Sequence, residues 1–104
     1  MLGDDGDAVN AGFIGRIDAV ADGRSAETAA AIAADYHMVA QAKLIAGVWQ
    51  SPYAEATRRK LIMALDGRVR DYGRCRDAYL VYRDAARFLE AQPFPAPKPD
   101  RESR

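Results

Sequence analysis

The chain has 104 residues, enough for a single domain with a small hydrophobic core. Lysines and arginines number 15, as do aspartates and glutamates, and the resulting net charge of zero disfavours a dedicated nucleic-acid binder. A single cysteine, Cys75, excludes an internal disulfide and suits a reducing compartment. The N-terminal region lacks the basic residues of a secretory signal, and no apolar run is long enough to cross a bilayer. We therefore expect a cytoplasmic protein with no membrane partner.

The charges are unevenly distributed along the chain. Residues 1–35 carry seven acidic and two basic side chains, whereas residues 54–90 carry nine basic and six acidic ones. Such segments can attract each other, either within one chain or between two copies. Any such contact should join the acidic front of the chain, residues 1–35, to its basic back, residues 54–90.

Helical periodicity begins after an acidic arm, residues 1–7, which we expect to be flexible. Apolar residues recur at helical spacing over 8–22, and Gly23 is a natural helix stop, so a short amphipathic helix is predicted here. A second helix should start at Ser25, whose hydroxyl can cap the first turn, and should end near Gln50. Its alanine-rich beginning gives way to bulky residues, so we expect its C-terminal end to be the most buried part of the protein.

Ser51 and Pro52 mark the start of a third helix, because serine caps a first turn and proline is tolerated within it. Proline also disfavours helical geometry in the residue before it, so the chain should reverse sharply at this point. We therefore expect the second and third helices to be antiparallel neighbours. The residues expected to form the core of this hairpin are Ile45, Trp49, Leu61 and Leu65.

The segment from Pro52 to about Ala91 has a heptad-like seam, with apolar and tyrosine side chains at alternate steps of three and four residues and Arg68 as the misfit. One continuous helix of this length would measure ~60 Å, so a second subunit would have to cover part of it. The alternative is a break near Gly67, because Gly67 and Gly73 together cost a helix about 2 kcal/mol. The unbroken seam favours the continuous helix and, with it, a homodimer.

Residues 92–104 contain four of the five prolines and should form an extended or disordered tail. The chain therefore divides into an acidic arm over 1–7, a helical domain over 8–91 and a Pro-rich tail over 92–104. The predicted fold class is all-α. It is an antiparallel helical hairpin with an additional short N-terminal helix, which makes a three- or four-helix bundle.

The stretch RVRDYGRCRDAYLVYRD, residues 68–84, allows two interpretations. In the first, its tyrosines pack between helices and the arginines lay their stems over the aromatic edges. In the second, tyrosines and arginines form a binding face for a protein, or for the bases and phosphates of a nucleic acid. The neutral net charge and the interleaved aspartates favour the first over a nucleic-acid face. The candidate interaction face comprises Arg68, Tyr72, Arg76, Tyr79, Tyr82, Arg83 and Arg87.

The sequence contains no recognisable catalytic constellation. His37 is the one histidine, and the positions three and four residues from it hold no acid, so we expect a satisfied histidine within a helix. Cys75 has no histidine near it in sequence and should fill space in the seam. The segment beginning at Asp5 starts like a calcium loop but has Arg16 where the closing glutamate is required. We therefore expect no enzyme activity, no cofactor and no metal site.

A length of about 100 residues, two long helices and Trp49 just before a central reversal resemble the small helical-hairpin proteins secreted by the type VII pathway. Their Trp-x-Gly motif requires glycine where Ser51 stands. Their tail signal requires an acid four residues after a tyrosine, and Tyr79 is followed at that distance by Arg83. The resemblance is therefore one of architecture.

These observations favour a small non-enzymatic interaction or adaptor protein that binds another protein, such as a phage or mobile-element protein docking on host machinery. One alternative is a nucleic-acid-associated regulator that uses the Arg/Tyr face within residues 58–87. Another is an accessory subunit of an enzyme whose active site lies on a different chain. The expected assemblies are a homodimer and a complex with a protein partner.

Overall fold

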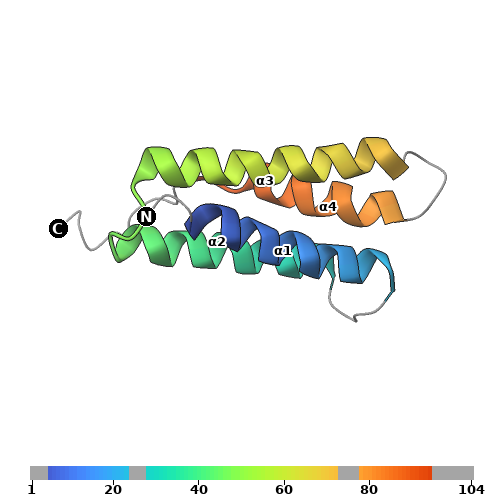
Figure 1. The fold of residues 1–104 in the computed structure, drawn as a ribbon, viewed down its shortest axis with the longest axis horizontal. Coiled ribbons are helices and arrows are strands. Elements are labelled where there is room, and N and C mark those ends of the chain that lie inside the picture. The colour runs from blue at the N-terminus through green and yellow to red at the C-terminus, as the bar shows by residue number, and fades with distance from the viewer. Residues whose placement is uncertain (1–4, 24–27, 73–77, 95–104) are drawn as a thin grey trace.

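A computed structural model describes residues 5–23, 28–72 and 78–94 of the chain. These residues form four α-helices, in the order α1 (Asp5–Ala21), α2 (Ala29–Ile45), α3 (Ser51–Tyr72) and α4 (Ala78–Ala91). The helices lie side by side in one bundle, so the predicted all-α class is confirmed and the bundle has four helices (Figure 1). None of the described helices is long and apolar enough to span a membrane.

The predicted continuous helix over 52–91 is wrong. α3 ends at Tyr72 and α4 begins at Ala78, and α4 runs back antiparallel to α3 and packs along it (Figure 1). Gly67 lies inside α3, so the break is not there; it falls at residues 73–77, which are outside the described part of the chain. The reversal lets both halves of the seam bury their side chains in the same bundle. The length mismatch that favoured a homodimer is thereby removed, and the homodimer remains an untested prediction.

α2 ends five residues earlier than expected. Gly47 has φ of 79°, a left-handed conformation that glycine adopts without strain, and the Val48 amide donates to the Lys43 carbonyl at 2.9 Å. The chain then turns Trp49 inward, where it is only 2% exposed, and leaves Ile45 82% exposed. The predicted place of Ile45 in the hairpin core is therefore wrong, because the helix ends before Trp49 and the two side chains do not share a face.

α2 and α3 are not the close neighbours that the Ser51-Pro52 reversal predicted. They run in opposite directions, but α4 packs against both of them and α1 does the same from the other side (Figure 1). α2 and α3 thus lie across the diagonal of the bundle and make little direct contact. The reason is that α4 runs back antiparallel to α3 and takes the position beside α2 that a two-helix hairpin would have given to α3.

The N-terminal boundaries of the first two helices also differ from expectation. α1 begins at Asp5 and so includes the last residues of the expected arm. α2 is capped by Thr28, whose hydroxyl accepts a hydrogen bond from the Ala31 amide at 3.2 Å. Ser25, the expected cap, lies outside the described residues.

All four helices contribute to one hydrophobic core. The largest fully buried side chains are Ile17 of α1, Ile32 and Tyr36 of α2, Leu61 and Leu65 of α3, and Tyr82 and Leu89 of α4. Trp49, Leu61 and Leu65, three of the four residues expected in the hairpin core, are thus buried. Burial of side chains of this size stabilises by about 1.5–3 kcal/mol each.

Candidate functional site

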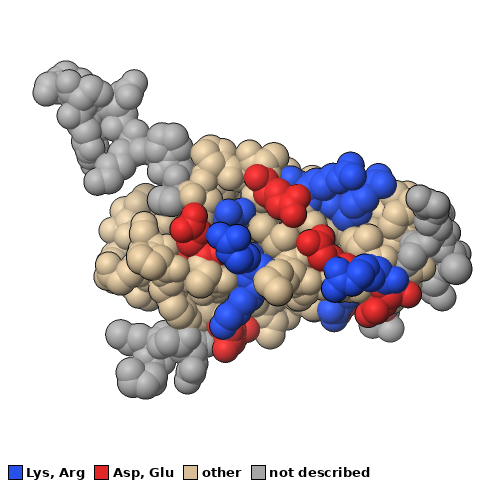
Figure 2. Space-filling view, turned by 90° about the horizontal axis from the view of Figure 1, so that it is seen from above, with Lys and Arg blue, Asp and Glu red and all other residues tan. Residues whose placement is uncertain are grey.

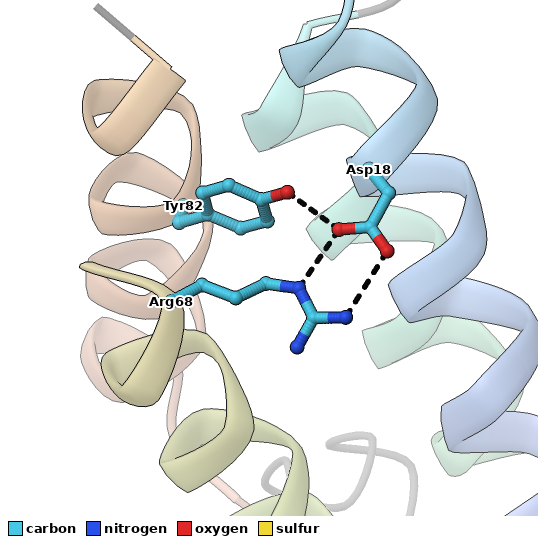
Figure 3. A network of polar contacts seen from close by, with 3 residues as sticks. All are labelled: Asp18, Arg68 and Tyr82. Atoms are coloured by element: carbon cyan, nitrogen blue, oxygen red, sulfur yellow. Dashed lines mark hydrogen bonds and ion pairs between the residues drawn. The ribbon is translucent and has the colours of Figure 1, made fainter. Parts of the chain in front are cut away.

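Three helices meet at the carboxylate of Asp18 (Figure 3). Arg68 of α3 donates from Nε to Oδ1 at 2.8 Å and from Nη2 to Oδ2 at 3.1 Å. The Tyr82 hydroxyl of α4 also donates to Oδ1, at 2.5 Å. A two-point arginine–carboxylate pair has a defined geometry, so Asp18 fixes α1 against α3 and α4 together.

The hydrogen bonds of this cluster favour the charged forms of Asp18 and Arg68. Partial burial opposes ionisation of Asp18, but the hydrogen bonds from Arg68 and Tyr82 outweigh it and lower the Asp18 pKa. The hydrogen bonds that Arg68 donates to Asp18 in turn raise the pKa of Arg68. Burial, followed by the hydrogen bond to Asp18, raises the pKa of Tyr82, so its hydroxyl stays protonated and serves as a donor. The carboxylate is thus committed to two partners and is poorly placed to act as a base.

The candidate Arg/Tyr face is divided by the fold. Tyr82 is buried, Tyr72 stacks on it with ring centroids 5.6 Å apart, and the Arg68 guanidinium lies 5.8 Å from the Tyr82 ring. Arg83 lies over Tyr79 at 5.7 Å, and its Nε atom is buried with no hydrogen-bond partner among the described residues. Arg87, beyond this stretch, is exposed, and Arg76 lies outside the described residues. The six described residues of the candidate face therefore do not form one surface.

A second polar cluster joins the start of α1 to the turn between α2 and α3. Asp5 accepts from the Trp49 indole nitrogen at 3.1 Å and pairs with Lys43 at 2.9 Å. The Gly6 amide donates to the Tyr53 hydroxyl at 3.0 Å. A Cβ atom on Gly6 would lie 2.6 Å from that hydroxyl oxygen and 2.8 Å from Oγ1 of Thr57, so the contact requires glycine.

The middle of α1 makes further contacts with both neighbouring helices. Asn10 donates from Nδ2 to the Thr57 carbonyl at 2.9 Å, and Arg16 pairs with Asp35 of α2 at 2.9 Å. Phe13 meets Tyr36 edge-on at 5.2 Å. We use "α1 docking surface" for the residues of the other helices and turns that hold α1: Asp35, Tyr36, Lys43, Trp49, Tyr53, Thr57, Lys60, Arg68 and Tyr82.

Sequence reasoning did not identify Asp18, Asp5 or the α1 docking surface. Its one usable signal was the charge distribution, in which an acidic front precedes a basic back. In the structure, aspartates of α1 meet basic residues of later helices, so part of the expected attraction operates within one chain. The specific pairs were not predictable, because they are about 40–50 residues apart and depend on the helix arrangement.

A third cluster surrounds Phe94, which follows α4 in the segment expected to be an extended tail. The Arg58 guanidinium lies 4.9 Å from the Phe94 ring and donates from Nη1 to the Leu89 carbonyl at 2.8 Å. His37 contacts the same ring edge-on at 5.9 Å. Burial, followed by the charge of Arg58, lowers the pKa of His37. Its Nδ1 has no hydrogen-bond partner among the described residues, contrary to the satisfied histidine that was expected.

The outer faces of the bundle differ in character. The view onto α3 shows acidic and basic side chains interleaved (Figure 2). Exposed charged residues of α3 include Glu55, Arg59, Lys60, Arg70 and Asp71. By contrast, the exposed residues on the outward face of α2 are apolar: Ala31, Met38, Ala42 and Ile45. Asp35, at the edge of this face, pairs with Arg16.

Within the described ranges, no three side chains of His, Cys, Asp or Glu are grouped so that they could hold a metal ion. No family model, no curated protein and no solved structure matches the chain.

Proposed function

We propose that the protein is a small helical adaptor without catalytic activity, which binds another protein through the outward face of α2. The observation that carries this proposal is the exposure of Met38 and Ile45, at 66% and 82%, on one face of the helix. Positions 31, 38, 42 and 45 recur at helical spacing, so their side chains form a stripe along α2. Val48, in the turn that follows, extends the apolar character past the end of the helix.

Single exposed apolar side chains are common on soluble proteins, so the alignment of this stripe matters more than its size. Each square ångström of apolar surface that a partner covers contributes about 25 cal/mol to the stability of the complex. Met63 of α3 is equally exposed, at 63%, but it lies close to the charged residues Arg59 and Lys60. Met63 is therefore a matched control, because its side chain is as exposed as that of Met38 but does not belong to an apolar stripe.

The experiment compares three forms of the immobilised full-length protein in a capture from native lysate, with identification by mass spectrometry. The variant Met38→Glu, Ile45→Glu should lose specific partners that the unaltered protein and Met63→Glu both retain. All three should have the same helical circular dichroism, because the altered side chains are exposed. Retention of the same partners by the double variant would contradict the proposal. A discrete submicromolar complex with DNA or RNA in a gel shift at physiological salt would instead support the nucleic-acid alternative.

A further inference from the structure

α1 is attached to the rest of the bundle in a different way from the other helices. Its fully buried residues are Gly6 and Ile17, whereas α2 and α3 each bury five. The other apolar side chains of α1 that pack against the core stay partly exposed: Val9, Phe13, Ile14, Val20 and Ala21. Gly12 and Gly15 have open space where a Cβ would lie, so no packing contact requires them, and glycine weakens a helix. Hydrophobic burial and helix propensity therefore hold α1 less strongly than they hold α2 or α3.

Polar contacts add to this partly exposed apolar packing. Three aspartates of α1 each meet a cation on the α1 docking surface: Asp5 with Lys43 at 2.9 Å, Asp7 with Lys60 at 3.9 Å, and Asp18 with Arg68 at 2.8 Å. The pairs extend over 13 residues, or about 20 Å of helix. Buried aromatic side chains add donors beside the cations, from the Trp49 indole and the Tyr82 hydroxyl. These three pairs join acids of α1 to a surface of cations and aromatic side chains, whereas Arg16 of α1 pairs with Asp35 of α2 in the opposite sense.

The other three helices also pack on one another without α1 between them. α4 packs against both α2 and α3 along the bundle, and the large buried side chains Leu61, Leu65 and Leu89 lie on this part of the fold. If α1 left, Lys43, Lys60 and Arg68 would lose their carboxylates. Another helix that supplied acids at similar spacing, with an apolar face in place of Phe13, Ile17 and their apolar neighbours on α1, would restore these contacts.

We propose that the α1 docking surface binds an acidic amphipathic helix of a partner protein, and that α1 is the intramolecular occupant that this helix displaces. The charge complementarity of the three aspartate–cation pairs identifies the chemistry of the partner. The partner helix displaces α1 through local opening of the bundle, because regions with few buried apolar contacts open at lower free energy than the core. This inference does not depend on the outward face of α2.

The test uses a fluorescein-labelled peptide of residues 5–23 as the acidic helix, titrated into the full-length protein and followed by anisotropy. Replacing Asp18 by Asn in the protein weakens its own α1 but leaves Arg68 free for the peptide, so the peptide should bind about tenfold more tightly. Replacing Arg68 by Gln removes the contact for both competitors, so peptide affinity should change by no more than about twofold. Both variants break the same ion pair, and a merely structural effect would change both affinities alike.

A matched peptide with Asn at positions 5, 7 and 18 should bind the unaltered protein at least about tenfold more weakly than the acidic peptide.

The amides of α1 should exchange with solvent at least about tenfold faster than those of α3, through local opening. Equal protection of α1 and α3, or equal peptide affinity of the two protein variants, would overturn the proposal. The variant Met38→Glu, Ile45→Glu should bind the peptide with the same affinity as the unaltered protein. A negative result for peptide binding can therefore be told apart from a negative result for partner binding at the outward face of α2.

Discussion

Arg68 holds Asp18 through two parallel hydrogen bonds, although the two residues are 50 positions apart in the chain. The pair joins α1 to α3, and Tyr82 adds α4 through the same carboxylate. Arg68 was the one misfit in the apolar seam, and this contact explains its presence there. Its guanidinium pairs with the Asp18 carboxylate of α1 instead of packing within the seam.

Asp18→Asn and Arg68→Gln should each lower the free energy of unfolding by about 1–2 kcal/mol, because each removes charge-assisted hydrogen bonds that solvent only partly screens. The double variant should lose less than the sum of the single variants, with a coupling energy of at least about 0.5 kcal/mol. Urea unfolding of the four proteins measures the coupling. The exposed Arg87→Gln is the control and should stay within about 0.5 kcal/mol of the unaltered protein. Strictly additive losses at positions 18 and 68 would show that the two side chains do not interact in solution.

The Asp18 pair should also make stability depend on acidity. The Asp18 pKa is lower in the folded than in the unfolded protein, so the stabilisation is complete above the unfolded-state value of about 3.9. It is lost as pH falls through the lower, folded-state pKa. Urea midpoints measured from about pH 5 down to about pH 2 should fall more steeply for the unaltered protein than for Asp18→Asn. Parallel curves would mean that Asp18 contributes nothing to acid unfolding.

His37 should add a separate dependence at higher pH. Burial and then Arg58 lower its pKa, so the unfolded chain takes up a proton first as pH falls below about 6.5. Stability should therefore decrease with falling pH below that value and level off below the folded-state pKa of His37. His37→Gln should remove this slope, while the slope due to the carboxylates at lower pH persists. Titration of the His37 ring by NMR provides the direct measurement, and a pKa above 6.5 would contradict the prediction.

Two glycines of α1 should respond in opposite ways to replacement by alanine. Gly6→Ala places a methyl group within 3 Å of Tyr53 and Thr57, so we expect a loss of about 1–3 kcal/mol. Gly12→Ala meets nothing within 4 Å, so the gain in helix propensity should stabilise the protein by about 0.5–1 kcal/mol. Thermal unfolding of the two variants provides the comparison. A destabilised Gly12→Ala protein would indicate that another chain packs closely against α1 at this position.

Trp49 and Ile45 form a second matched pair, at the end of α2. Trp49→Ala should cost about 3–5 kcal/mol, because it removes a buried ring that stacks edge-on with Tyr53 and donates to Asp5. Ile45→Ala should change the free energy of unfolding by less than about 0.5 kcal/mol, because its side chain is in solvent. Denaturant unfolding distinguishes the two outcomes. A large loss at Ile45 would show that a second copy or another segment covers it in solution.

The local pattern was sufficient to predict a helical protein and much of its core. Leu61, Leu65, Tyr82 and Leu89 follow the seam spacing and are buried, because periodic apolar side chains must share one helix face. The spacing could not show whether the seam belongs to one long helix or to two antiparallel helices, because both arrangements bury the same positions. Gly67 was a misleading signal, since a glycine can remain inside a helix at modest cost.

Contacts between distant segments were beyond the reach of local pattern. The charge distribution indicated an acidic front and a basic back, and three pairs between α1 and later helices realise that attraction. Which aspartate meets which cation depends on the antiparallel packing of α4 against α3 and on the glycine turn at Gly47, both of which set the helix order around the bundle. The same turn placed Trp49 inside and left Ile45 in solvent, because a helix that ends one turn earlier rotates every following side chain to a new direction.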